Sequence, residues 1–258
     1  MLLAFDVGNT VIAVGVFDGR SLLRSWKVRT DSDKTGDEYG VTFLDLMRVA
    51  GLEPAEITAA IVSSVVPPLT PVIEEVCRGF FGRAPLVVGP GLRTGMPILY
   101  ENPFEVGADR IAAAVAAFET YGGPAIVVDF GTATTFDAIS AKGEYLGGAI
   151  APGIRIAAEA LTLKTARLPR VEIRKPKRAI GRTTVASMQS GLYFGYIGLV
   201  TNTIAEIRGE LGGTARVVAT GGFGGQVAAE LPAIEAFEPD LVLMGLRIIH
   251  ERNRDAAA

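Results

Sequence analysis

One phrase recurs in the two halves of this chain and constrains its fold more than any other feature. An apolar run ends in aspartate, and glycine and threonine follow within a few residues, at Asp6 in FDVGNT and at Asp129 in VDFGTATTFD. Glycine lets the backbone turn tightly with exposed N–H groups, which suits phosphate oxygens. One such phrase is weak evidence, because aspartate and glycine are common in turns. Two at matching places indicate a duplicated domain with a nucleotide cleft between the copies.

The elements around the two phrases follow the same order in both halves. Three short strands come first, from LLAFDVG, VIAVGVFD and SLLRSWKVR in one half and from AIVVDFG, TTFDAIS and EYLGGAIA in the other. Helices and strands then alternate, with a long helix expected over about 183–211 and an alanine-rich one over 108–121 between the halves. We therefore predict an α/β fold with a mixed sheet and flanking helices, present twice. Chance recurrence of this order is the weaker alternative, because the Asp-Gly turns recur with it.

Composition excludes several classes of protein. Hydrophobic residues make up 49% of the 258 residues and the net charge is −3, so neither disorder nor a nucleic-acid partner is expected. No apolar run approaches the roughly 18 residues of a membrane span, and Asp6 interrupts the opening too early for a signal peptide.

The single cysteine, Cys77, lies in an apolar helical pattern and is expected to be a buried thiol in a reducing cytoplasm. The single histidine, His250, leaves almost no material for a zinc site or a Ser-His-Asp triad. We interpret the basic stretch 167–182 as a solvated connection.

The segment ENPFEVGADRIAAAVAA holds the strongest candidate for catalysis. Asp109 and Arg110 stand where a helix begins, and Tyr100 lies a short loop upstream. An aspartate in a first helical turn is often only a cap or a dipole partner. The adjoining arginine favours chemistry, since aspartate can accept a proton from a hydroxyl while arginine holds an anion.

A third glycine cluster, ATGGFGG at 219–225, follows an expected strand. It is either a flexible turn or a backbone laid flat against a nucleotide, and the two Asp-Gly turns favour the second. It lacks the Gly-Lys-Ser/Thr of a Walker A loop, and no G-x-G-x-x-G follows the first strand.

Together these strings resemble the type III pantothenate kinases of the sugar kinase/Hsp70/actin superfamily. The resemblance covers nearly the whole chain and rests on DVGNT, RTDSDKTGDEYG, SSVVPPLT, NPFEVGADRI, VVDFGTATTFD, GEYLGGAIAPGI, TARLPRV, TTVASMQSGLYFGY and ATGG. It implies duplicated ribonuclease-H-like (actin-like ATPase) domains, each a mixed five-stranded sheet with flanking helices, at residues 1–118 and 119–258, with the last helix able to pack back on the first domain. It also implies ATP-dependent phosphorylation of pantothenate to 4'-phosphopantothenate, the first step of coenzyme A biosynthesis, by a homodimer that uses Mg²⁺ and a monovalent cation (K⁺ or NH4⁺).

The resemblance assigns roles to individual residues. Asp109 would be the general base, and Asp129 would hold the monovalent cation. ATP would be bound by Thr132 and by a first phosphate loop of Asp6, Val7, Gly8, Asn9, Thr10, Val11, Ile12 and Ala13. Pantothenate would be bound by Tyr100, Gly107, Ala108, Asp109, Arg110 and Thr184, and Thr184 would reach a neighbouring protomer's site.

The chain departs from the family pattern in three places. Val11 stands where an asparagine is common, Ala113-Ala114 stands where Asn-Ala is usual, and GLVTNTI and the end of ATGGFGG differ in detail. Two alternatives stay open: another small-molecule kinase of the same superfamily, and a non-catalytic regulatory relative. The GADR string with Tyr100 argues against the first. Retention of all three aspartates (Asp6, Asp109 and Asp129) argues against the second.

Overall fold

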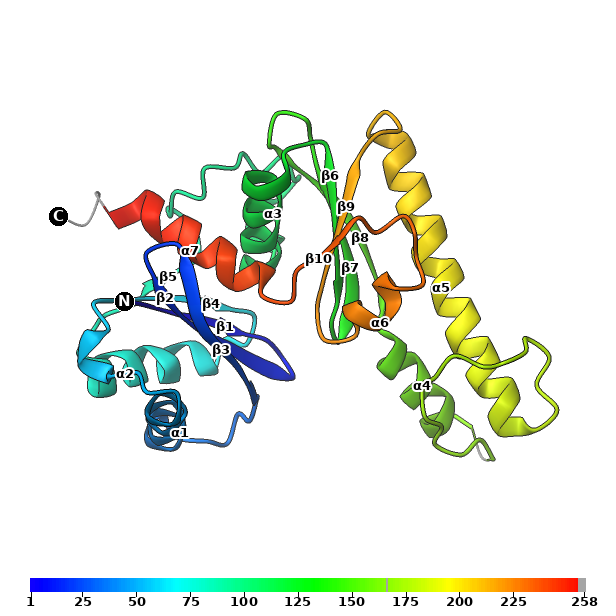
Figure 1. Cartoon of the computed structure of the whole chain (residues 1–258), viewed down its shortest axis with the longest axis horizontal. Helices are drawn as coiled ribbons and strands as arrows, with labels where there is room; N and C mark the ends of the chain where they lie inside the picture. Colours follow the sequence, from blue (N-terminus) through cyan, green and yellow to red (C-terminus); the bar gives the residue numbers. More distant parts are fainter. Residues whose placement is uncertain (166, 255–258) are drawn as a thin grey trace. The chain divides into compact units, whose positions relative to one another are not determined.

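Each Asp-Gly phrase ends the central strand of its own five-stranded sheet (Figure 1). The structure is a computed structural model and describes residues 1–165 and 167–254. One sheet lies in a unit made of Met1–Thr120 and the chain from Asp240 onward, and the other lies in a unit made of Tyr121–Pro239. The predicted fold, a mixed five-stranded sheet with flanking helices occurring twice, is confirmed. The predicted domain limits, 1–118 and 119–258, stay a prediction.

The first sheet has the strand order β3-β2-β1-β4-β5. Strand β1 pairs antiparallel with β2 and parallel with β4, and this register sets Asp6 beside Ser63. The hairpin predicted at Asp18-Gly19 is present, and Gly19 takes the left-handed φ of 55° that the turn requires. The strands are β1 (Leu2–Val7), β2 (Val11–Asp18), β3 (Ser21–Arg29), β4 (Ala59–Ser64) and β5 (Leu86–Val87).

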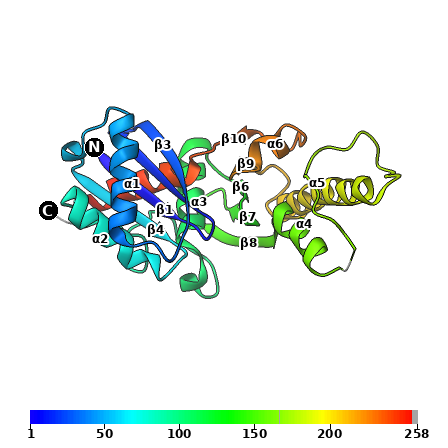
Figure 2. The ribbon, with the colours of Figure 1, turned by 90° about the horizontal axis from the view of Figure 1, so that it is seen from below.

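Helices cover both faces of the first sheet (Figure 2). On one face, Phe43 of α1 (Gly36–Val49) and Ile73 of α2 (Leu69–Phe81) join Phe5 in one core cluster. Helix α7 (Leu241–Asn253) contacts β1, β2 and β4 from the other face. Gly245 of α7 lies so near the backbone of Ala112 in α3 (Ala108–Tyr121) that no Cβ fits between them. Single turns of 3-10 helix occur at η1 (Pro54–Glu56) and η2 (Pro103–Glu105).

The second sheet has the order β10-β9-β6-β7-β8, which repeats the plan of the first. Strand β6 pairs antiparallel with β7 and parallel with β9, and Asp129 lies beside Thr135 on one side and Thr220 on the other. The strands are β6 (Ala125–Phe130), β7 (Ala133–Ile139), β8 (Tyr145–Pro152), β9 (Arg216–Thr220) and β10 (Ala236–Phe237).

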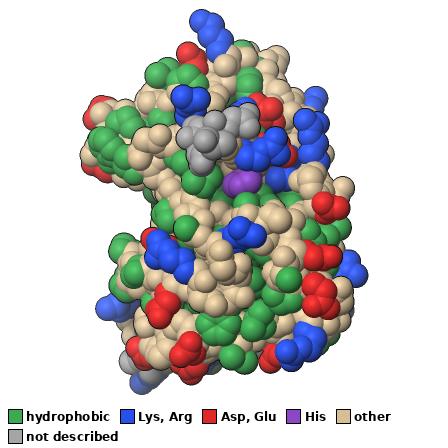
Figure 3. All heavy atoms as spheres, turned by 90° about the vertical axis from the view of Figure 1, so that its left-hand side faces the viewer, with side chains coloured by type: hydrophobic (Ala, Val, Ile, Leu, Met, Phe, Trp, Pro, Cys, Tyr) green, Lys and Arg blue, Asp and Glu red, His purple; other side chains and the backbone are tan. Residues whose placement is uncertain are grey.

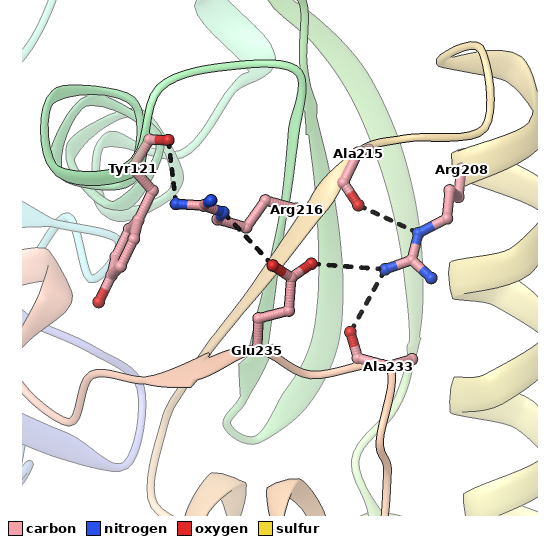
Figure 4. A network of polar contacts seen from close by, with 6 residues as sticks. All are labelled: Tyr121, Arg208, Ala215, Arg216, Ala233 and Glu235. Carbon is pink, nitrogen blue, oxygen red and sulfur yellow. Dashed lines mark hydrogen bonds and ion pairs between the residues drawn. The ribbon is translucent and has the colours of Figure 1, made fainter.

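The long helix α5 (Thr184–Glu210) supplies most of the cover of this sheet, with Tyr196, Val200 and Ile204 in the core cluster. Two shorter helices, α4 (Ile154–Leu163) and α6 (Gly224–Ala228), follow β8 and β9. A polar network fastens the last turns of α5 (Figure 4). The Arg208 guanidinium donates to the Ala215 carbonyl at 3.0 Å and lies 3.9 Å from the Glu235 carboxylate, which also pairs with Arg216.

Two predictions from composition are met in the structure. Cys77 is buried, and burial raises the pKa of its thiol to about 12. The stretch 167–182 is a mostly exposed connection without helix or strand. On the face in Figure 3, basic and acidic side chains are interspersed and form no continuous basic surface. Within residues 1–165 and 167–254, no helix is long and apolar enough to cross a membrane.

Candidate active site

The first Asp-Gly turn joins β1 to β2 and is held from both sides. Asp6 accepts a hydrogen bond at 3.0 Å from the Ser63 hydroxyl on the parallel neighbour β4. The Gly8 N–H donates to the Val11 carbonyl at 3.1 Å, and the Thr30 hydroxyl donates to the Gly8 carbonyl at 2.6 Å. A Cβ on Gly8 would lie 3.0 Å from that Val11 carbonyl, so the tight turn favours glycine. The turn is therefore fixed before any ligand arrives.

Only part of the predicted phosphate loop can reach a ligand with side chains. Val7 and Ile12 are fully buried in the core of the first unit. Asn9, Thr10 and Val11 are exposed at the tip of the turn, and Val11 retains 38% of its accessible surface. The apolar Val11 offers no side-chain donor, so this turn would hold phosphate with its backbone and with its polar neighbours.

The carboxylate of Asp129 leaves no room for a side chain at Gly221. A Cβ on Gly221 would overlap Oδ1 of Asp129, and a Cβ on Gly131 would lie 3.6 Å from the same atom. Gly221 has the left-handed φ of 91°, which other residues rarely adopt. On the other face of the sheet the Tyr196 hydroxyl is 2.7 Å from that of Thr134. Burial raises the pKa of Tyr196, and the charge of Asp129 acts in the same direction.

Thr132 belongs to a turn on which the start of α4 packs directly. The Gly153 N–H donates to the Thr132 carbonyl at 3.2 Å. A Cβ on Gly153 would overlap that carbonyl and lie 2.7 Å from the carbonyl of Gly131. The IAPGI string thus supplies a glycine that allows the Gly131-Thr132 turn and the helix to approach each other.

The ATGGFGG cluster divides into positions with different surroundings. Gly221 borders Asp129, as described above, whereas a Cβ on Gly224 or Gly225 would meet the ring of Phe237. Nothing lies within 4 Å of the space above Gly222. Packing therefore explains three of these glycines, and Gly222 is the one that remains a candidate for contact with a nucleotide.

Asp109 is half-buried in the first turn of α3, where predicted. Its Oδ1 accepts the Arg110 N–H at 2.8 Å and occupies the space where a side chain on Gly107 would begin. Burial raises the pKa of the Asp109 carboxyl above its ordinary value, and the hydrogen bond and charge of Arg110 oppose that rise. The carboxylate is therefore a stronger base than an exposed aspartate, which suits a proton acceptor.

The other predicted substrate residues fall in both units. Tyr100 and Arg110 are half-buried in the first unit. Thr184 is exposed in the second unit, as the first residue of α5 after the cap residue Thr183. Thr184 lines a groove of about 490 Å³ together with Leu161 of α4 and Met188 of α5.

Three structural partners of the predicted site carried no assigned role. Thr30 holds the Gly8 carbonyl, Ser63 holds Asp6, and Gly153 admits the Gly131-Thr132 turn. All three lie in strings that carry the resemblance, namely RTDSDKTGDEYG, SSVVPPLT and IAPGI. Position inside a family string is thus the signal that could have indicated them.

The donor groups near Asp129 limit which cation fits there. Among the residues that the structure describes, no three His, Cys, Asp or Glu side chains gather as a metal cluster. The register partners of Asp129 on the neighbouring strands are Thr135 and Thr220, and Gly221 borders its carboxylate. A carboxylate flanked by threonines and glycine would suit a hard cation better than a transition metal.

Comparison with known proteins gives consistent matches. A model of the type III pantothenate kinase family matches residues 2–206. A type III pantothenate kinase of Geobacter sulfurreducens is 55% identical over 99% of this chain and 100% of its own length. Another, of Moorella thermoacetica, is 56% identical over 98% of this chain and 100% of its own length.

Solved structures agree on the fold. A Baf family protein from Campylobacter jejuni superposes with a TM-score of 0.64 at 19% identity, over 98% of this chain and 99% of that one. The inorganic polyphosphate/ATP-glucomannokinase of Arthrobacter sp. strain KM gives 0.50 at 15% identity, over 97% and 98%. Such identities show the fold alone, and that fold is the predicted duplicated ribonuclease-H-like one.

Proposed function

The chain belongs to the type III pantothenate kinase family, and we propose that Asp109 is the general base of the reaction. The reaction is ATP-dependent phosphorylation of pantothenate, the first step of coenzyme A biosynthesis. The observation that carries the proposal is the placement of Asp109: its carboxylate is half-buried, its pKa is raised by burial, and Gly107 leaves it room.

In the proposed step, Asp109 accepts the proton of the primary hydroxyl of pantothenate while the hydroxyl oxygen attacks the γ-phosphorus of ATP. The bond between that phosphorus and the β–γ bridging oxygen breaks, and ADP leaves. Asp109 then returns the proton to solvent. Arg110, next to Asp109 on the first turn of α3, would hold an anionic group of the substrate.

Nucleotide binding would use the turn from Asp6 to Ala13 in the first unit and Thr132 in the second. Support comes from the fixed first turn, whose exposed tip of Asn9, Thr10 and Val11 presents backbone next to a carboxylate. When bound, Mg²⁺ and a monovalent cation would neutralise charge on the phosphates, and Asp129 would hold the monovalent cation.

Pantothenate binding would use Tyr100, Gly107, Ala108, Asp109, Arg110 and Thr184, and we propose a homodimer in which Thr184 reaches the partner's site. Support for the dimer comes from apolar surface around α4 and the start of α5: Leu163 is 77% exposed and Val185 41%. Light scattering on the purified protein would measure its mass. A monomeric mass at micromolar concentration would refute the dimer. The single cysteine and the use of ATP support a place in the cytoplasm.

The first test is ADP release by the purified chain with ATP and Mg²⁺, with and without pantothenate, in potassium or sodium buffer. We expect release that pantothenate stimulates and that potassium supports better than sodium. Equal stimulation in both buffers would refute the monovalent-cation site at Asp129 and leave the rest of the proposed function standing. Stimulation by another small-molecule alcohol in place of pantothenate would point to a different kinase, and no stimulation with ATP still bound would point to a regulatory relative.

A further inference from the structure

The last turn of α7 is hydrogen-bonded to the chain just before the loop that carries Tyr100. The Arg252 guanidinium donates through Nη1 to the Thr94 carbonyl and through Nη2 to the Glu119 carboxylate, the latter at 2.5 Å. Glu119 lies in the last turn of α3, the helix whose first turn holds Asp109. One side chain thus joins a loop and a helix that both carry proposed substrate residues.

Asn253 adds a second attachment next to the first. Its amide pairs with the backbone of Arg93 as a neighbouring strand would: Oδ1 accepts the Arg93 N–H at 3.0 Å, and Nδ2 donates to the Arg93 carbonyl at 2.8 Å. Nδ2 also donates to the Ile249 carbonyl of α7 at 2.7 Å. Asn253 is only 6% exposed. An amide buried in this way is costly unless every one of these partners is kept.

The chain at the attachment is shaped to fit the arginine. Gly95 has the left-handed φ of 71°, and a Cβ there would lie 2.6 Å from the Arg252 guanidinium. The Thr94 hydroxyl donates to the Met96 carbonyl at 3.1 Å and accepts the Met96 N–H at 3.3 Å. Met96 is buried. The attachment therefore extends from Arg93 to Met96.

The far end of the same loop runs into α3. Val106 is buried and Gly107 leads into the helix, whereas the residues between Met96 and Val106 are mostly exposed and include Tyr100. Arg252 ties the near end of the loop to the last turn of α3, and the far end is continuous with its first turn. Both ends of the loop are thus attached to a single helix, and fixing both ends lowers the entropy that a ligand must remove.

We infer that Arg252 and Asn253 are positioning residues for pantothenate, acting through the loop from Pro97 to Glu105 that bears Tyr100. The inference rests on the proposed role of Tyr100 and deepens it. The match to the family model ends at residue 206, so these residues lie outside the matched segment. Their removal would loosen the loop, weaken pantothenate binding and leave ATP binding unchanged.

The experiment compares Arg252→Ala and Asn253→Ala with the wild type, and adds Arg252→Lys as a milder variant. The matched control is Arg48→Ala, because Arg48 forms only an exposed ion pair with Asp45 in α1, with its side chain 79% exposed. Steady-state kinetics give KM for pantothenate and for ATP, and hydrogen exchange reports the protection of residues 93–106.

For both alanine variants we expect KM for pantothenate to rise about tenfold, the loss that one charge-assisted hydrogen bond of Arg252 or two neutral ones of Asn253 account for. KM for ATP should stay within twofold, exchange should quicken in residues 93–106, and Arg252→Lys should fall between wild type and Arg252→Ala. Arg48→Ala should match the wild type throughout.

Unchanged KM for pantothenate in the alanine variants would overturn the inference, and so would an equal rise of both KM values, which indicates general destabilisation. If an alanine variant does not fold, Arg252→Lys decides by the same criteria. A wild type without pantothenate-stimulated ADP release would refute the proposed function, whereas hydrogen exchange would still show whether Arg252 and Asn253 fix the loop.

Discussion

Replacing Gly107 by alanine tests whether the position of the Asp109 carboxylate matters. A Cβ on Gly107 would overlap Oδ1 of Asp109, whereas Cγ1 of Val65 would lie at an ordinary 3.6 Å. The backbone of Gly107 is not in the left-handed region, so alanine adds no backbone strain there. The displaced atom is the end of a side chain, which can rotate. The substitution should therefore lower stability moderately and activity strongly.

Both magnitudes follow from the contacts of Asp109. Rotation of the carboxylate loses the hydrogen bond from the Arg110 N–H at 2.8 Å, which is worth about 1–2 kcal/mol. For a chain of this size, that loss lowers Tm by roughly 2–8 °C. Displacing a catalytic group by about 1 Å can lower the rate about 100-fold. We expect kcat to fall by that factor, with KM for ATP within twofold of the wild type.

The assay is ADP release at saturating ATP over a range of pantothenate concentrations, with Tm measured on the same samples. Gly79→Ala is the matched control, because Gly79 lies exposed in α2 and nothing lies within 4 Å of its added Cβ. That variant should keep full activity and gain about 0.5–1 kcal/mol of stability. A Gly107→Ala enzyme with at least half of the wild-type kcat would refute the reasoning, since the carboxylate would then work from a displaced position.

Four further predictions concern groups of the site and core. Asp109→Asn should lower kcat about 10²–10⁴-fold while calorimetry shows ATP binding within twofold; an equal loss of both would refute the general base. Burial raises the pKa of the Asp109 carboxyl, so the folded state favours its protonated form. The ionised carboxylate therefore destabilises the folded protein increasingly as pH rises from the ordinary pKa of aspartate through the raised pKa. Asp109→Asn should raise Tm at pH 7 and leave it unchanged at pH 3. Gly221→Ala should lower Tm and raise the potassium concentration for half-maximal activity, because its Cβ would overlap both the Phe130 backbone and the Asp129 carboxylate; an unchanged potassium dependence would contradict this. Cys77, with a thiol pKa of about 12, should react with a disulfide reagent only in denaturant, and rapid reaction of the native protein would show that it is accessible.

Local signals predicted most of the elements. The helix at 108–121 has the predicted limits because its alanines favour helix and Gly122, with a φ of 75°, ends it. The hairpin at Asp18-Gly19 is equally local. Strand β10 was not predicted, because its two residues, Ala236 and Phe237, become a strand only by pairing with Val218 and Ala219. Two residues are too short a run to show the pattern of a strand in the sequence.

The sequence predicted which positions belong to the candidate site, but it predicted less of the surroundings that set their chemistry. A motif indicates that Asp109 is important, but the rise in its pKa comes from burial, which depends on the packed structure around the first turn of α3. The same limit applies to Arg252 and Asn253. Their partners at Arg93 and Thr94 lie about 160 residues away in the sequence, at separations of 160 and 158, and no periodicity connects them.

The duplication explains why two aspartates with the same local sequence have different surroundings. Both end a central strand, and in both units the parallel neighbour sets a hydroxyl residue beside the aspartate, Ser63 beside Asp6 and Thr220 beside Asp129. The two units then differ at the next residue: Ser64 follows Ser63 in the first unit, whereas Gly221 follows Thr220 in the second and lies against the Asp129 carboxylate. The first aspartate therefore accepts a hydrogen bond from a hydroxyl, and the second occupies the space beside a glycine. A duplicated strand fixes where a carboxylate stands, and the residue that follows the neighbouring hydroxyl residue decides how much room that carboxylate has.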